Sequence, residues 1–451
     1  MIGFSVTEQA WSERPKDDEQ AFSSPWERYR LSSQRPEMER EGWTMAGPFA
    51  GQSSESPVAD GPAAGQNKGR ASLRNWWRGA SKGELAIVLL SALGIATSMY
   101  LFVSQRDIGS VGLFALISTV PLLLVLTVLI RADRFAPIEA RYVVLAALWG
   151  AGIATVIASV INSALLADFI ATLGDMSRAE TIAATVVAPL SEELLKGGGV
   201  ILVLLICRNR IVSATNGLVI AGTAGAAFAF VENIQYFLQA QTDSSAVLGA
   251  TIVGRLVLSP FIHPMATSFI GFFFASAILK GTGAWSWFWR IAVGFALAML
   301  THALWNGLAS VGSSTWLLFY VLIEVPLFVG WLVWVSTQGN RQMRQIRSGL
   351  SSYVATGWIS PAEEKMVTDA QARKYARRWA RKVGRPAKVA MRKYLQTAGR
   401  LGLDQSNMEQ AGPDPKRVDN ARESLLALAE YRETYLHLGE IYAASSTGGR
   451  P

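Results

Sequence analysis

Residues 181–206 read TIAATVVAPLSEELLKGGGVILVLLI, an almost wholly apolar stretch that contains Glu192, Glu193 and Lys196. Stretches of about 20 apolar residues match a hydrocarbon core ~30 Å thick, because a helix rises ~1.5 Å per residue. Similar stretches recur between residues 85 and 336, so the sequence predicts an all-α, polytopic membrane helix bundle of about eight spans. The predicted spans are 85–103, 111–130, 142–166, 181–206, 213–238, 256–279, 291–309 and 315–335.

The 451-residue chain divides into three parts by composition. Residues 1–72 are rich in Gly, Pro, Ser, Glu and Gln without apolar periodicity, which predicts a disordered segment. Residues 73–336 form the predicted membrane domain, and residues 337–451 are polar and basic, as expected of a helical cytoplasmic region. Lys and Arg precede the first span and gather in alternate loops, so the positive-inside rule places both termini in the cytoplasm.

The formal net charge of +8 does not by itself indicate nucleic-acid binding, because the basic loops and tail account for it. From Arg373 to Arg400 there are eleven Lys or Arg and no Asp or Glu. We expect this stretch to lie near anionic lipid, and nucleic acid is the less favoured partner. Cys207 is the only cysteine, which excludes an intrachain disulfide and a thiolate zinc cage.

Ionisable and polar residues recur at helical spacing in four consecutive spans. Each costs several kcal/mol in lipid unless it is paired or lines a wet cavity, so such a cluster indicates a functional site. Lys196 follows Glu192 by four residues, the favourable order for a helical ion pair, and follows Glu193 by three. These residues would supply a general base, although the spacing also fits a structural ion pair. The other members are Glu232 and Asn233, then His263, then His302 and Asn306.

Two kinds of chemistry fit these residues. With the predicted orientation, the cluster falls between mid-membrane and the outer leaflet, where a common cavity is feasible. Glu232, His263 and His302 would make a catalytic zinc site with an open position for water and a second glutamate as base. Alternatively, a glutamate and a histidine activate water without a metal, while the other histidine and Asn306 stabilise the oxyanion. The sequence leaves both open.

Four motifs, in order on consecutive spans, resemble the PrsW family of intramembrane proteases, relatives of the CAAX prenyl endopeptidases and bacteriocin-processing proteins. The resemblance covers roughly residues 85–336 and implies a metalloprotease of the bacterial cytoplasmic membrane. It implies cleavage of a membrane-anchored protein, in some members an anti-sigma factor. The motifs are Glu192-Glu193-x-x-Lys196, Phe228-x-x-x-Glu232-Asn233, His263-x-x-x-Thr267-x-x-x-Gly271 and His302-x-x-Trp305-Asn306.

The resemblance also implies roles for individual residues. Glu192 and Glu193 would be the general-base pair beside Lys196. Glu232 and His263 would be metal or water ligands, with His302 and Asn306 completing the site.

Two other classes of protein remain open at this point. Intramembrane Glu and His also serve as proton relays, so a proton-coupled transporter is the main alternative. The chain lacks a convincing internal repeat between the first four and last four spans, which weighs against a transporter. A non-catalytic membrane receptor or scaffold that uses the basic tail is the third alternative.

Overall fold

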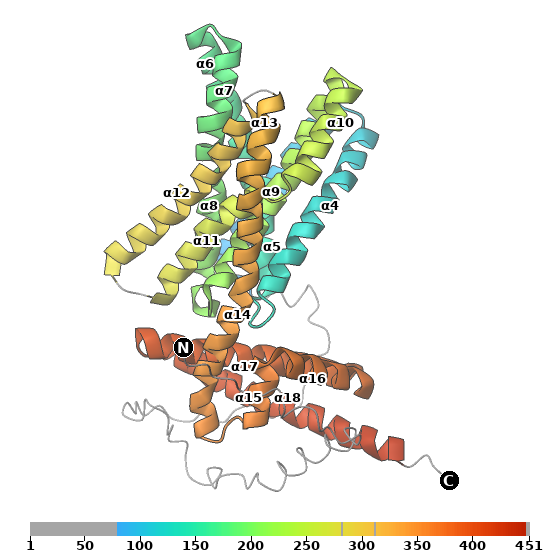
Figure 1. Cartoon of the computed structure of the whole chain (residues 1–451), viewed down its shortest axis with the longest axis vertical. Helices are drawn as coiled ribbons and strands as arrows, with labels where there is room; N and C mark the ends of the chain where they lie inside the picture. The colour runs from blue at the N-terminus through green and yellow to red at the C-terminus, as the bar shows by residue number, and fades with distance from the viewer. Residues whose placement is uncertain (1–78, 281–282, 311–312, 448–451) are drawn as a thin grey trace, which may run out of the picture. The chain divides into compact units, whose positions relative to one another are not determined.

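The computed structural model describes residues 79–280, 283–310 and 313–447, and every regular element in these residues is a helix (Figure 1). The prediction of disorder for residues 1–72 lies outside the described residues. The first part of the fold comprises α3 (Lys82–Gln105), α4 (Ile108–Ala132), α5 (Ala140–Trp149), η3 (Gly150–Ala154), α6 (Thr155–Leu173), α7 (Met176–Ile182), η4 (Ala183–Val187), α8 (Ala188–Ile206), η5 (Arg208–Arg210) and α9 (Ala214–Asp243). The second part comprises α10 (Ser245–Val253), η6 (Gly254–Leu258), α11 (Ile262–Lys280), α12 (Gly283–Ala309), α13 (Ser313–Phe319), η7 (Tyr320–Glu324), α14 (Val325–Ala355), α15 (Pro361–Thr368), α16 (Ala370–Val383), α17 (Arg385–Ala411) and α18 (Pro415–Thr447).

The predicted all-α membrane fold is confirmed. In the described residues, seven helical segments are long and apolar enough to cross a membrane. The fourth predicted span, 181–206, is helical as well, but the charges of Glu192, Glu193 and Lys196 set it apart from these seven. The charges that weaken its apolar character are therefore the ones that mark the site.

Helix α9 lies at the centre of the bundle, with 83% of its apolar window buried. Its backbone packs closely against that of α11, because glycines at the contact leave no side chain between the two helices. A Cβ atom built on Gly217 would lie 2.1 Å from the carbonyl oxygen of Gly271, and one built on Gly225 would lie 2.5 Å from that of His263. The glycines of α9 thus set how closely His263 approaches the centre of the bundle.

Several spans contain a single π-helical turn, which disturbs the regular backbone hydrogen bonds and leaves carbonyl groups for side chains to satisfy. In η4, the Ala184 carbonyl accepts a hydrogen bond from Asn306 Nδ2 at 2.8 Å. In η6, the Leu258 carbonyl accepts one from the Tyr320 hydroxyl at 3.1 Å. These two turns lie directly before α8 and α11, the helices that carry the predicted site residues.

Helix α14 runs from the apolar part of the chain into the C-terminal region without a break at residue 336. The helices that follow have an interior of their own, which includes the buried rings of Tyr394 and Tyr435. Arg432 pairs with Glu363 through two hydrogen bonds of 2.6 and 2.9 Å. Residues 412–414 separate α17 from α18.

Candidate active site

Helix α8 holds the first motif in the interior of the bundle. Glu193 and Lys196 are both 0% exposed, and Lys196 Nζ lies 2.6 Å from Glu193 Oε1. The same ammonium lies 3.6 Å from Glu192 Oε2 and 4.2 Å from the ring centroid of Phe228. The predicted ion pairs on this helix are therefore present, and the lysine joins both carboxylates.

The carboxylate of Glu193 is fully used by protein partners. Besides Lys196, it accepts a hydrogen bond from Thr267 Oγ1 at 2.9 Å, and His302 Nδ1 lies 3.0 Å from Oε1. Since a carboxylate only accepts hydrogen bonds, His302 Nδ1 carries the proton here and Nε2 is left free. Glu193 thus fixes the tautomer and direction of the His302 ring.

The second histidine is oriented in the same way by another carboxylate. His263 Nε2 lies 2.8 Å from Glu232 Oε2, while its Nδ1 lies 2.9 Å from Lys196 Nζ. An ammonium only donates, so Nδ1 accepts from Lys196, which leaves the proton on Nε2, the nitrogen that faces Glu232. The rings of His263 and His302 meet edge to face, with centroids 4.8 Å apart. The predicted convergence of the two histidines is confirmed by these distances.

One nitrogen of each imidazole also faces the same carboxylate oxygen, Glu192 Oε2. His263 Nδ1 and His302 Nε2 each lie 3.9 Å from Glu192 Oε2. That oxygen is buried and has no hydrogen-bond partner in the described residues, whereas Oε1 accepts from Asn162 Nδ2 at 3.2 Å. One carboxylate oxygen and two imidazole nitrogens thus surround a common point from three different helices.

In the described residues, Glu192, His263 and His302 form the group that could hold a metal ion, with one ligand atom from each within 4.8 Å of the others. Glu232, which the sequence predicts as a ligand, lies on the other side of the His263 ring. It also pairs with Arg255 Nη2 at 2.8 Å. This arrangement is typical of metal-binding histidines, whose second nitrogen usually donates to a carboxylate.

The charges of the site do not balance when its carboxylates are ionised. Glu192, Glu193 and Glu232 face two permanent cations, Lys196 and Arg255, so one negative charge is left with neutral imidazoles. An uncompensated charge in a low-dielectric interior is unfavourable. The residues therefore favour a further cation or a proton between Glu192 and the histidines.

Two functional residues were missed by the sequence reasoning. Arg255 lies in η6, within what the sequence predicts as an external loop, and its guanidinium stacks over Tyr236 at 3.9 Å. Asn162 lies on α6, where it donates to Glu192 and accepts from Ser191 Oγ at 2.6 Å. An arginine and an asparagine within apolar runs are themselves signals of intramembrane function, and both could have been found this way.

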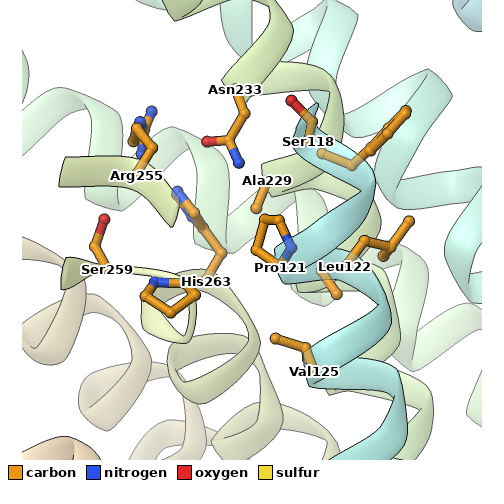
Figure 2. Close-up of a pocket in the computed structure, with 12 residues that line it drawn as sticks. Ser118, Pro121, Leu122, Val125, Ala229, Asn233, Arg255, Ser259 and His263 are labelled. Atoms are coloured by element: carbon orange, nitrogen blue, oxygen red, sulfur yellow. The ribbon is translucent and has the colours of Figure 1, made fainter. Parts of the chain in front are cut away.

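Two of the predicted residues lie outside this cluster of contacts. The Asn306 amide is engaged by the Ala184 carbonyl, one helical turn beyond His302. Asn233 lines a small pocket on the other side of His263, together with Arg255 and Ser118 (Figure 2). The pocket lies between α4, α9 and the break that precedes α11. It leads from apolar side chains of α4 to the His263 ring.

Residues 139–331 match the family model described as PrsW family intramembrane metalloprotease. The family is PrsW. The matched segment contains every residue of the cluster described above, so the resemblance expected from the motifs is confirmed. No curated protein and no solved structure gives a significant match to the chain.

The match to the PrsW family model supports intramembrane peptidase activity in a multi-pass membrane protein. The matched segment excludes α3, α4 and the helices after residue 331. Helix α4 nevertheless supplies one wall of the pocket beside His263. The chain thus completes the surroundings of the site with a helix that the family match does not include.

Proposed function

We propose that this chain is an intramembrane peptidase that hydrolyses a peptide bond of a membrane-anchored protein, using water activated beside Glu192. The observation that carries the proposal is the convergence of three atoms: His263 Nδ1 and His302 Nε2 each lie 3.9 Å from Glu192 Oε2. A general base must reach the proton that it removes directly or through one water. Glu192 Oε2 has no competing hydrogen bond in the described residues, so it is available as an acceptor beside the two imidazoles.

The donor atoms fit a zinc ion, because two imidazoles and a carboxylate leave an open position for water. Glu192, His263 and His302 would hold it, and Glu193 and Glu232 would orient the two rings. When bound, zinc supplies a Lewis acid that generates hydroxide near neutral pH. The predicted ligand set of Glu232, His263 and His302 changes in this proposal, since Glu232 contacts the outer nitrogen of His263.

Lys196 and Glu193 act as positioning residues in this proposal. Lys196 Nζ donates to His263 Nδ1 at 2.9 Å, so this nitrogen can bind a metal only when the ammonium turns away. Glu193 Oε1 lies 2.6 Å from Nζ and would retain it. Without a metal, Glu192 Oε2 would take the proton of the water directly.

A pocket of about 10 Å³, the size of a single water, lies beside His263. Its α4 wall is apolar except for Ser118, while Asn233 and Arg255 supply polar groups near the site (Figure 2). An extended peptide exposes backbone donors and acceptors that need partners inside the bilayer. We infer that the cleaved segment belongs to a single-span protein, an anti-sigma factor being one candidate. The host membrane would be the bacterial cytoplasmic membrane, with both termini of the chain in the cytoplasm.

The experiment that tests the activity is co-reconstitution of the purified full chain with a panel of tagged single-span membrane proteins. Glu192→Gln should abolish cleavage, because the amide cannot take a proton from water. Glu180→Gln on α7 is the matched control, since Glu180 is exposed and belongs to no ion pair in the described residues. Equal cleavage by the Glu192→Gln variant and wild type would refute the proposal, and proton-coupled transport without cleavage would favour the alternative function.

The role of zinc needs a separate measurement on the same protein. Elemental analysis should find about one zinc per active chain, and a strong chelator should remove both zinc and activity. His302→Ala should lower the zinc content, whereas Asn162→Ala should leave zinc bound while slowing cleavage. Full activity in demonstrably metal-free protein would instead assign catalysis to Glu192 and the histidines alone.

A further inference from the structure

A second group of charged side chains lies far along the sequence from the catalytic cluster, around the ring of Phe135. Phe135 is buried in the connection that follows α4. The guanidinium carbon of Arg134 lies 4.6 Å from the ring centroid, and that of Arg373, from α16, lies 5.0 Å from the same centroid. Two arginines from distant parts of the chain are thus held together by one aromatic ring.

The backbone of the chain fixes this ring from two further helices. A Cβ atom built on Gly399 of α17 would lie 2.5 Å from the Phe135 carbonyl oxygen. One built on Gly339 of α14 would lie 3.1 Å from the Phe135 ring and 3.4 Å from Arg134 Nη2. The two arginines therefore stand on a packed surface rather than on a mobile loop.

The positive charges of this group have no acidic partner in the described part of the chain. No ion pair joins Arg134, Arg373 or Arg377 to a carboxylate there, although Arg373 is only 5% exposed. Arg373 Nη1 donates to the Val367 carbonyl at 3.0 Å, but its Nη2 is buried without a hydrogen-bond partner. Burial and the like charges of Arg377 and Arg134 lower the pKa of Arg373.

A buried guanidinium beside like charges is unfavourable unless an anion compensates it. The fork of N–H donors in arginine matches phosphate oxygens in a bidentate manner. Two such groups over one ring, with the charge of Arg377 near them and an unused donor on the buried Arg373, have the chemistry of a phosphate site. Diffuse attraction to a charged surface would not require the buried Arg373.

The position of the group favours a lipid as the source of the phosphate. Arg134 follows the last residue of α4 by two positions, so it lies where a membrane-spanning helix leaves the hydrocarbon. The end of α4 exposes Ile130, which is 65% accessible and suited to contact acyl chains. Headgroup phosphates occupy this level of a bilayer, and cytoplasmic leaflets attract basic side chains through their anionic lipids.

We propose that Arg134, Arg373 and Arg377 form a specific binding site for the phosphate of an anionic phospholipid, at the junction of α4 with α16. The site is independent of the proposed peptidase activity. It gives the basic C-terminal region one defined contact with the bilayer, in addition to its general positive charge.

The test compares arginine with lysine, which keeps the charge but loses the planar fork. The full chain is purified in detergent, and thermal unfolding is followed during titration with short-chain phosphatidylglycerol or phosphatidylcholine. The Arg134→Lys/Arg377→Lys variant should weaken the apparent affinity for phosphatidylglycerol about tenfold, as expected for lost charge-assisted hydrogen bonds. Arg378→Lys/Arg381→Lys, two exposed arginines of α16, is the matched control and should change the affinity less than twofold.

A second variant addresses the buried arginine separately. If the Arg373→Lys variant folds, it should show the same loss of affinity for phosphatidylglycerol. If it does not fold, the Arg134→Lys/Arg377→Lys variant still tests the site, because both of its substituted residues are exposed. Equal affinity in wild type and both variants would overturn the proposal. Equal losses in the test and control variants would also overturn it, because they would indicate diffuse attraction. Stabilisation by inorganic phosphate but not by phosphatidylglycerol would refute the lipid assignment.

Discussion

The Lys196→Met substitution is the most direct test of how the catalytic cluster is stabilised. The ammonium lies 2.6 Å from Glu193 Oε1 and 2.9 Å from His263 Nδ1, at 0% exposure. Methionine keeps most of the apolar stem but removes the cation. The excess negative charge of the cluster then rises by one, in a place that water does not reach.

The size of the effect follows from this burial. Removing one partner of a buried ion pair costs about 3–5 kcal/mol, because the other charge remains without compensation. An equilibrium constant changes tenfold for every ~1.4 kcal/mol, so folding should weaken by roughly a hundredfold or more. For a domain of this size, the unfolding temperature should fall by about 10 °C.

Thermal unfolding of the full chain in detergent measures this effect. Lys280→Met, at the exposed end of α11, is the control and should shift the unfolding temperature little. A double-mutant cycle with Glu193→Gln should give a coupling energy of about 1–3 kcal/mol, since the two residues are in contact. Strict additivity in that cycle, or a Lys196→Met variant as stable as the Lys280→Met control, would refute the assignment of a buried ion pair.

Two further predictions concern packing and pH. Gly199→Ala should destabilise the protein by about 1–3 kcal/mol through overpacking, because the new Cβ would lie 2.1 Å from Trp149 Nε1. Gly198→Ala is the control: its Cβ would point into open space, so this variant should be as stable as the wild type. Equal unfolding temperatures for these two variants would contradict the packing described here. Burial raises the pKa of Asp133, outside the membrane spans, from 3.8 to about 7, so the folded state favours its protonated form. The protonated Asp133 therefore contributes its full stabilisation of the folded state below pH 3.8, and this contribution is lost as the pH rises through 7. In unfolding measurements over this window, the stability of the Asp133→Asn variant should depend less on pH than that of the wild type.

The sequence by itself determined the fold class and most residues of the cluster, although not Arg255 and Asn162. Apolar length is a local property, so the spans could be found without knowing how they pack. Intramembrane charges are costly, and this made Glu192, Glu193, Lys196, His263 and His302 visible as candidates. Of the predicted spans, only 181–206 is too rich in charged residues to count among the candidate membrane spans of the described residues, because its charged residues belong to the site.

The tertiary structure decided which atoms of these residues face one another. The rotation and closeness of α9 and α11 depend on contacts such as that between Gly225 and the His263 carbonyl, which helical spacing does not specify. These contacts place Glu232 on the outer nitrogen of His263 and leave Glu192 Oε2 between the two rings. Arg255 entered the site for the same physical reason: side chains from separate helices meet only when packing brings them together.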